Sequence, residues 1–151
     1  MKNIKGQSLF EVILAIFIIT LIVVAVVILS TNSISNSLAS RNKTLASKYT
    51  QEAIEWLRKQ KESDYIDFKE KATPGFTYCL IATLNWNRPA VCGPGQTIDA
   101  NSIFRREVSF SKEEDVIDKY IIIADVVTYW DDSKGRHEAR SITYFSDARE
   151  Q

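Results

Sequence analysis

The chain has 151 residues, of which 45% are hydrophobic and 25% charged, and its formal net charge is zero. This balance is ordinary for a folded protein and argues against a surface built to bind a polyanion. His137 is the only histidine, which excludes multi-histidine metal sites, and no motif for phosphate binding, nucleophilic catalysis or paired acid–base chemistry is present. We therefore expect a protein that is not an enzyme and that carries no metal or cofactor.

The first predicted element is an apolar segment near the N-terminus. Residues 12–29 carry no charge, and Thr20 is the only polar residue among them. As a helix this segment extends roughly 27 Å, close to the hydrocarbon thickness of a bilayer. Lys2 and Lys5 precede it, whereas the next basic residue is Arg41. The positive-inside rule therefore predicts a cytoplasmic N-terminus and an extracytoplasmic remainder.

A secretory signal peptide and a plain membrane anchor are the two ordinary interpretations of such a segment. A signal peptide has an apolar region of about 7–15 residues and then a small-residue cleavage site. Here the run is longer and continues into helix-compatible sequence after Ser30. A plain anchor leaves Glu11 unexplained, because it is the only charged residue between Lys5 and Arg41 and an unpaired carboxylate in an apolar setting is costly.

The stretch KGQSLFEVILAIFIITLIVV resembles the class III signal of type IV pilins and pseudopilins. In that family a short basic leader ends in glycine, and a hydrophobic helix carries glutamate at its fifth residue. The resemblance covers about residues 5–30. It implies cleavage between Gly6 and Gln7 by a prepilin peptidase, followed by N-terminal methylation. It also implies that Glu11 acts in assembly with other pilin or pseudopilin subunits, and that an assembly platform and a motor are further partners. The sequence departs from the family in having Gln7, where phenylalanine or methionine is usual, and in lacking the proline of many major pilins.

The same residues support an assembly role on physical grounds. Cleavage after Gly6 would remove both lysines and expose an α-amine, which is usually protonated at neutral pH. In a helix Gln7 and Glu11 are four residues apart and lie on one face. The carboxylate can then meet its own amine or that of a neighbouring subunit. Only one axial offset pairs the charges of neighbours, so Glu11 would set the register of assembly.

A polar but still helical segment follows the apolar one. No glycine or proline falls between Gln7 and Lys61, so a single helix of about 55 residues is expected. One apolar stripe recurs along it at helical spacing, formed by Leu38, Leu45, Tyr49, Ala53, Ile54, Trp56 and Leu57. We expect a sheet to pack on this stripe.

Beyond Thr73 the pattern changes to that of strands. Four are predicted, over residues 76–84, 103–110, 118–130 and 136–145, with a hairpin turn at residues 131–135. Joined by short turns, they form an antiparallel meander with one face on the helix, so the fold class is α+β. The resemblance implies the same architecture, the type IV pilin-like fold, with a long N-terminal helix packed on a roughly four-stranded antiparallel sheet.

Alternation predicts which side chains share a face of this sheet. In the first strand alternate residues from Phe76 to Leu84 lie together. In the second strand Phe104, Val108 and Phe110 share a face, and Arg106 is the polar exception on it.

The predicted organisation is a leader at residues 1–6, a transmembrane or filament-core half of the helix at 7–30, an amphipathic half at 31–62 and a sheet head at 63–151. The helix end QEAIEWLRKQ, followed by a cysteine-bearing strand, is similar to minor pilins of the V class and to I-type pseudopilins.

Cys79 and Cys92 lie on either side of a loop that contains proline. Because an exported head folds where disulfides persist, we expect them to form one. Two unrelated buried thiols are the alternative.

DNA is a further partner to consider, since some pilus systems take it up. Arg105 and Arg106 are adjacent and so face opposite ways on a strand. Arg136 and Arg140 share a face with Arg106 if the strand registers allow. Loss of the two leader lysines from 19 basic residues leaves 17 against 19 acidic ones, which disfavours a polyanion.

These observations predict a structural subunit, most like a minor pilin, of a type IV pilus or related filament. The alternatives are a type II secretion pseudopilin and a single-pass membrane-anchored binding domain. The expected location is the bacterial cytoplasmic membrane as a precursor, and then an extracytoplasmic filament or the cell surface.

Overall fold

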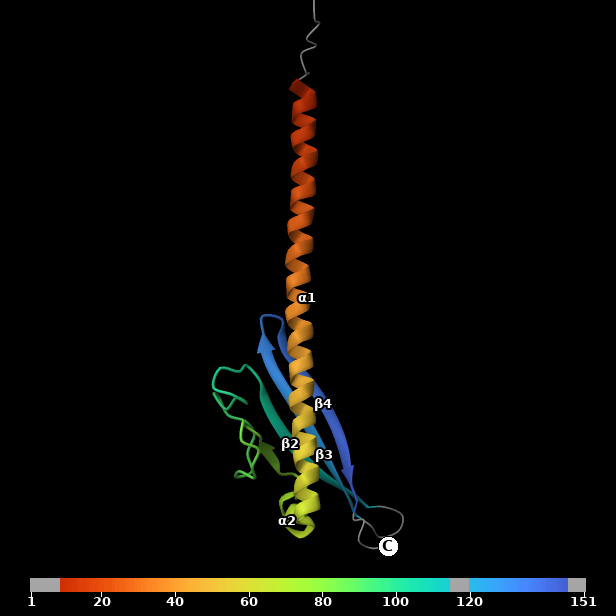
Figure 1. Ribbon diagram of the computed structural model, residues 1–151, viewed down its shortest axis with the longest axis vertical. Coiled ribbons are helices and arrows are strands. Elements are labelled where there is room, and N and C mark those ends of the chain that lie inside the picture. The colour runs from red at the N-terminus through yellow and green to blue at the C-terminus, as the bar shows by residue number, and fades with distance from the viewer. Residues whose placement is uncertain (1–8, 115–119, 147–151) are drawn as a thin grey trace, which may run out of the picture. The chain divides into compact units, whose positions relative to one another are not determined.

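A computed structural model describes residues 9–114 and 120–146 (Figure 1). Its elements are α1 (Leu9–Ser63), α2 (Tyr65–Lys71), β1 (Thr77–Cys79), β2 (Arg105–Glu114), β3 (Tyr120–Asp132) and β4 (Gly135–Phe145). The chain divides into two compact units, Met1–Arg41 and Asn42–Gln151, and α1 contributes to both. The long N-terminal helix and the four-stranded antiparallel sheet confirm the predicted α+β class.

The two helices follow from local sequence. The absence of glycine and proline lets α1 run unbroken for 55 residues. Asp64 then begins a new helix, because its Oδ1 accepts hydrogen bonds from the backbone N–H groups of Ile66 and Asp67, both at 3.0 Å. Helical periodicity did not predict α2, because its seven residues make less than two full turns.

The sheet is a simple meander in the order β1-β2-β3-β4, antiparallel throughout. The β3–β4 hairpin closes at the pair Asp132↔Gly135, and Gly135 has a φ of 115° that a residue with a Cβ rarely adopts. The Lys134 backbone N–H donates to Asp132 Oδ1 at 2.7 Å. The hairpin turn predicted at residues 131–135 is therefore confirmed.

The core of the C-terminal unit lies between the end of α1 and one face of the sheet (Figure 1). The main cluster joins residues of α1, α2 and all four strands with Ala72, which follows α2, and Leu80, which follows β1. Its members are Ala53, Ile54, Leu57, Phe68, Ala72, Tyr78, Leu80, Val108, Phe110, Ile122, Ala124, Val126 and Phe145. A second cluster holds Ala46, Ile98, Phe104 and Trp130. Each large apolar side chain removed from water in these clusters contributes about 1.5–3 kcal/mol to folding.

The buried face of α1 is centred differently from the predicted stripe. Its buried residues are Ala46, Thr50, Ala53, Ile54 and Leu57. Leu45, Tyr49 and Trp56 are only partly buried and lie at the edges of the clusters. Leu38 belongs to the N-terminal unit and is 53% exposed. The burial of Ala46 and Thr50 was not predicted, because neither residue is strongly hydrophobic.

The first strand is much shorter than predicted. Residues 76–84 were expected to form it, but β1 ends at Cys79. Just beyond β1, the Leu80 backbone N–H still donates to the Arg106 carbonyl at 2.8 Å, and the carbonyls of Leu80 and Ile81 accept hydrogen bonds from the Arg106 side chain. Of the predicted face, Tyr78 and Leu80 are buried, whereas Phe76 is 44% exposed.

Candidate assembly segment and head sites

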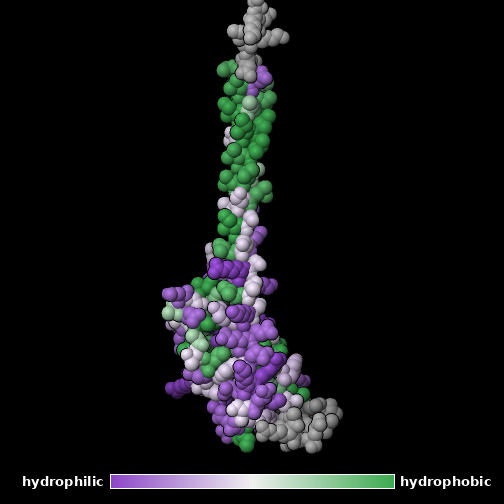
Figure 2. All heavy atoms as spheres, viewed as in Figure 1, coloured by the Kyte–Doolittle hydropathy of each residue, from purple (hydrophilic) through white to green (hydrophobic). Residues whose placement is uncertain are grey.

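The N-terminal unit presents an apolar helical surface. The apolar part of α1 is strongly hydrophobic and contains no buried residue. Hydrophobic side chains cover the visible surface of this part of the helix in Figure 2. The helix is long and apolar enough to cross a membrane.

The hydroxyl groups within and just after the apolar segment are satisfied by the helix itself. Thr20 Oγ1 donates to the Ile16 carbonyl at 2.8 Å. Thr31 Oγ1 lies 3.1 Å from the Val27 carbonyl oxygen and 2.9 Å from that of Ile28. Such back-bonding removes the need for an outside partner, so neither hydroxyl opposes placement in lipid.

Glu11 is the exception on this surface. It is exposed in the first turn of α1, where the helix dipole favours a negative charge. Over residues 9–40 it is the only charged residue, and no described residue pairs with its carboxylate. The predicted processing residues Gly6 and Gln7 lie outside the described residues, so the processing site stays a prediction.

A disulfide joins Cys79 and Cys92 in the head, with their Cα atoms 4.9 Å apart. It joins the end of β1 to the loop that contains Cys92. A hydrogen bond to β2 also holds this loop, because the Cys92 backbone N–H donates to Glu107 Oε1 at 2.7 Å. The same oxygen accepts a hydrogen bond from the Tyr129 hydroxyl at 2.8 Å. Closing this short loop contributes on the order of 3 kcal/mol in the chain-entropy description.

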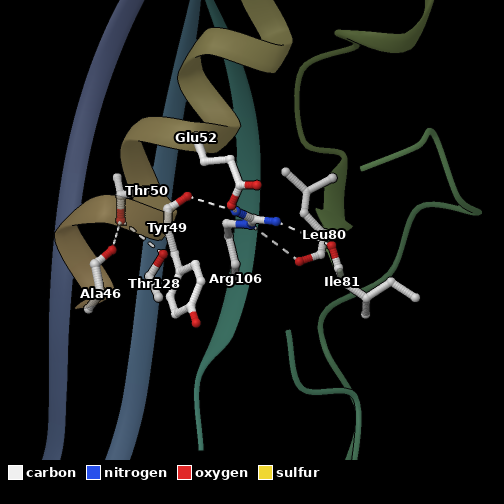
Figure 3. A network of polar contacts seen from close by, with 8 residues as sticks. All are labelled: Ala46, Tyr49, Thr50, Glu52, Leu80, Ile81, Arg106 and Thr128. Atoms are coloured by element: carbon white, nitrogen blue, oxygen red, sulfur yellow. Dashed lines mark hydrogen bonds and ion pairs between the residues drawn. The ribbon is translucent and has the colours of Figure 1, made fainter. Parts of the chain in front are cut away.

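Arg106 forms the polar centre of the head (Figure 3). It projects from the apolar face of β2, and its side chain is completely buried. Its Nη1 donates to the Tyr49 carbonyl at 2.8 Å and to Glu52 Oε2 at 2.9 Å. Nε and Nη2 donate to the carbonyls of Leu80 and Ile81 at 3.3 and 3.2 Å. One guanidinium therefore connects α1, β2 and the chain that follows β1.

Burial lowers the pKa of Arg106, and the hydrogen bond and charge of Glu52 oppose that shift. Arginine remains charged under such a shift because its ordinary pKa is so high. Arg106 is the polar exception that alternation predicted on this apolar face, and its hydrogen bonds explain why it is tolerated there. Every nitrogen of its buried guanidinium has an acceptor, in three backbone carbonyls and the Glu52 carboxylate.

Thr50 and Thr128 form a second polar link between helix and sheet (Figure 3). Thr50 Oγ1 lies 2.9 Å from Thr128 Oγ1 and 3.0 Å from the Ala46 carbonyl oxygen. Both threonines are buried. Hydropathy did not identify either residue, since nothing in the sequence tells which strand threonine faces the helix.

The strand registers separate the arginines considered for DNA. Arg106 pairs with Thr128, and Thr128 with Ala139, on the face that packs on α1. Arg136 and Arg140 lie on the opposite face with Arg105. The suggested grouping of Arg136 and Arg140 with Arg106 is therefore wrong, because a strand alternates faces at every residue.

His137 lies near the start of β4 and stacks on Trp130, with ring centroids 5.3 Å apart. One ring nitrogen is 3.0 Å from Asp132 Oδ1. The pKa of Asp132 lies below its ordinary value, first because it accepts the Lys134 backbone hydrogen bond and then because of His137. Within the described residues no group of three or more His, Cys, Asp or Glu side chains can hold a metal ion.

No protein-family model, curated protein or solved structure matches this chain.

Proposed function

We propose that this protein is a subunit of a type IV pilus or related filament, most similar to a minor pilin, with the pilin-like fold. The observation that carries the proposal is Glu11. It is an exposed carboxylate near the start of a helix that is apolar enough to cross a membrane, with no partner among the described residues. A carboxylate at membrane depth costs up to about 3 kcal/mol, so its presence calls for a positive partner.

The partner that fits is an N-terminal amine. Processing between Gly6 and Gln7 would place an α-amine one helical turn from Glu11, on its own subunit or a neighbour. Apolar helices gain little by leaving lipid for a bundle of similar helices. A charge pair in the low dielectric of such a bundle supplies the directional attraction that apolar contact lacks.

The head supports the same proposal. A helix packed on an antiparallel meander agrees with the layout implied by the resemblance. The Cys79–Cys92 disulfide suits a head that folds outside the cytoplasm. The filament is then assembled from subunits that enter through the inner membrane, are processed by a prepilin peptidase, and are lifted by an assembly platform and motor.

The test replaces Glu11 by valine in cells that contain the assembly machinery. Loss of a costly charge should leave membrane insertion at least as efficient as before. Intact mass should still show loss of residues 1–6, with or without one added methyl group. The amount of the variant in sheared filaments should fall about tenfold or more, because the amine of Gln7 has lost its partner.

Glu62→Val is the matched control, since Glu62 is an exposed carboxylate in the polar half of the same helix. It should reach the filament at the wild-type level. Wild-type incorporation of Glu11→Val would overturn the assembly role. Wild-type protein that stays full-length in the membrane despite active machinery would identify a plain anchor. Partners recovered with the wild-type chain distinguish a pilus, with its pilin and retraction motor, from a type II secretion channel.

A further inference from the structure

One edge of the sheet is open along a whole strand. β4 is the last strand in the order β1-β2-β3-β4, and no backbone group of the described residues pairs with its far side. In an antiparallel strand alternate residues turn their N–H and C=O groups away from the neighbouring strand. Alternate residues of Gly135–Phe145 therefore present free donors and acceptors to this edge, and a further strand is what fits such a row.

The chain itself closes most of the opposite edge. β1 has only three residues, and Tyr78 forms a bridge with Ala90 on its outer side. Pairing extends along β2 beyond β1, because the Phe110 backbone N–H donates to the Phe76 carbonyl at 3.3 Å. Residues 111–114 lie beyond that pairing and read SKEE. Charged side chains of this kind prevent pairing at exposed edges.

The two halves of β4 differ in the same respect. The first half carries three residues in ion pairs, Arg136, Glu138 and Arg140. The second half, residues 141–145, reads SITYF and has no charge and no proline. Its register with β3 continues without a bulge, and Ile142 and Tyr144 are 50% and 64% exposed. β-Branched and aromatic residues favour strands, so this half is suited to pairing and has no protection against it.

A groove follows the same half of β4 on the side of α1. One hollow of about 370 Å³ lies between α1, including Gln51, and residues 139–143 of β4. A second hollow of about 270 Å³ lies between the end of α1, including Lys61, and the end of β4. Arg58 and Thr143 line both, so the two are continuous. A strand added beside β4 would place alternate side chains in this groove.

The two faces of β4 indicate the composition of such a strand. Residues directly opposite each other on neighbouring strands share a face and contact each other. Ser141 and Thr143 line the groove, where hydroxyl groups make the most favourable cross-strand partners. Ile142 and Tyr144 lie on the outer face, where β-branched or aromatic side chains pack best. The matching strand is uncharged and alternates threonine or serine with β-branched or aromatic residues.

The β4 strand of a second copy has this composition, but symmetry opposes it as the partner. Two copies joined antiparallel through β4 are related by a two-fold axis perpendicular to the sheet. Because α1 packs on the face of the sheet, this axis reverses the direction of α1 between the copies. Subunits that come from one membrane enter their heads from the same side. This step rests on the proposed function, and it assigns the strand to a different protein.

We propose that the β4 edge binds an extended segment of a partner protein as a fifth, antiparallel strand. Main-chain hydrogen bonds supply the affinity, and the alternate side chains meet the groove on one face and Ile142 and Tyr144 on the other. The edge and Glu11 belong to different compact units of the chain. The inference therefore goes beyond the proposed assembly role of Glu11.

The experiment uses the full chain in phosphatidylcholine nanodiscs and two labelled peptides with blocked ends, EETVTVTEE and KKTVTVTKK. Fluorescence anisotropy should detect binding of at least one of them. Binding should also slow hydrogen exchange of amides in residues 141–145. Methylation of the backbone nitrogens of either the valines or the threonines separates strand pairing from apolar adsorption. Only one of these sets faces β4, so one methylated peptide should bind about tenfold more weakly than the other.

Two lysine substitutions test the edge. Ile142→Lys places a charge on the outer face of the uncharged half, and Thr143→Lys places one on the groove face. Each should weaken peptide binding about tenfold or more, and either one supplies the test if the other does not fold. Ile66→Lys is the matched control, because Ile66 is 71% exposed on α2, away from the groove. It should bind the peptide like wild type.

Three results would overturn the proposal: no binding of either peptide at millimolar concentration, wild-type affinity in both lysine variants, or equal affinity of the two methylated peptides. Dimers that form without peptide in analytical ultracentrifugation and are lost in Ile142→Lys would assign the edge to a second copy and overturn the partner assignment. Glu11→Val should bind the peptide like wild type. Failure of the filament test therefore leaves this test unaffected.

Discussion

Removal of the Arg106 guanidinium should destabilise the head more than any other single change of charge on the sheet. Arg106→Met keeps an unbranched apolar stem, so the test isolates the four hydrogen bonds made by the head group. The carbonyls of Leu80 and Ile81 lose their donors. Each unpaired buried acceptor costs about 1–3 kcal/mol.

The expected loss is about 3 kcal/mol, at the low end of the range for breaking a buried pair. The low end applies because the Glu52 side chain is 52% exposed and regains water when its partner is gone. By the same argument Glu52→Gln should cost about 1 kcal/mol or less. Arg106 would keep its three carbonyl acceptors in that variant.

The assay is urea unfolding of the full chain in micelles, followed by the fluorescence of Trp56, Trp86 and Trp130. With a slope of about 1–3 kcal/mol per molar urea, the midpoint for Arg106→Met should fall by about 1–3 M. Arg105→Met is the matched control. It removes the adjacent arginine, whose ion pair with Asp131 is long, at 3.7 Å, and partly exposed. The loss of stability should therefore be about 1 kcal/mol or less. A loss below 1 kcal/mol for Arg106→Met, or an equal loss for Arg105→Met, would refute this reasoning.

Two further predictions concern the outer side of the head. Replacing Cys79 and Cys92 by serine should lower the free energy of unfolding by about 3 kcal/mol. A reducing agent should bring the urea midpoint of wild type to that of the serine variant and leave the variant unchanged. Quantitative thiol labelling of denatured, unreduced wild type would show that the bridge is absent. Burial, followed by the hydrogen bond to Glu107, raises the pKa of Tyr129 above its ordinary value of 10.0. The neutral phenol is thus favoured in the folded state, and the resulting stability is complete below pH 10 and declines as the pH rises above it. Tyr129→Phe should flatten that alkaline decline in unfolding measurements, and an unchanged decline would contradict the assignment.

Local chemistry was enough to predict several parts of this protein from its sequence. Absence of glycine and proline allows one long helix, and the uncharged run from Val12 to Leu29 makes its beginning apolar whatever surrounds it. The hairpin turn depends on residues within five positions of one another, and the alternation in the strands sets which side chains share a face. Glu11 could also be identified from the sequence, because a single charged residue in an apolar segment is recognised without knowledge of its tertiary contacts.

Contacts between distant segments were beyond prediction. Beyond β1, the carbonyls of Leu80 and Ile81 accept hydrogen bonds from Arg106, which is about 25 residues away in the chain. The buried line of α1 passes through Thr50 because a threonine of β3 lies opposite it. Neither effect has a signal in the hydropathy of its own segment.

Sequence alone determined the elements whose causes are local: the unbroken apolar helix with its single carboxylate, the strand character of the head and the turn that joins its last two strands. Only the tertiary structure decided how the arginines are used. The register of β2, β3 and β4 buries Arg106 under α1 and places Arg105 beside Arg136 and Arg140 on the outer face. The physical reason is that a shift of one residue in any of these pairings would exchange the two faces, and the pairings are selected by burial across the whole sheet.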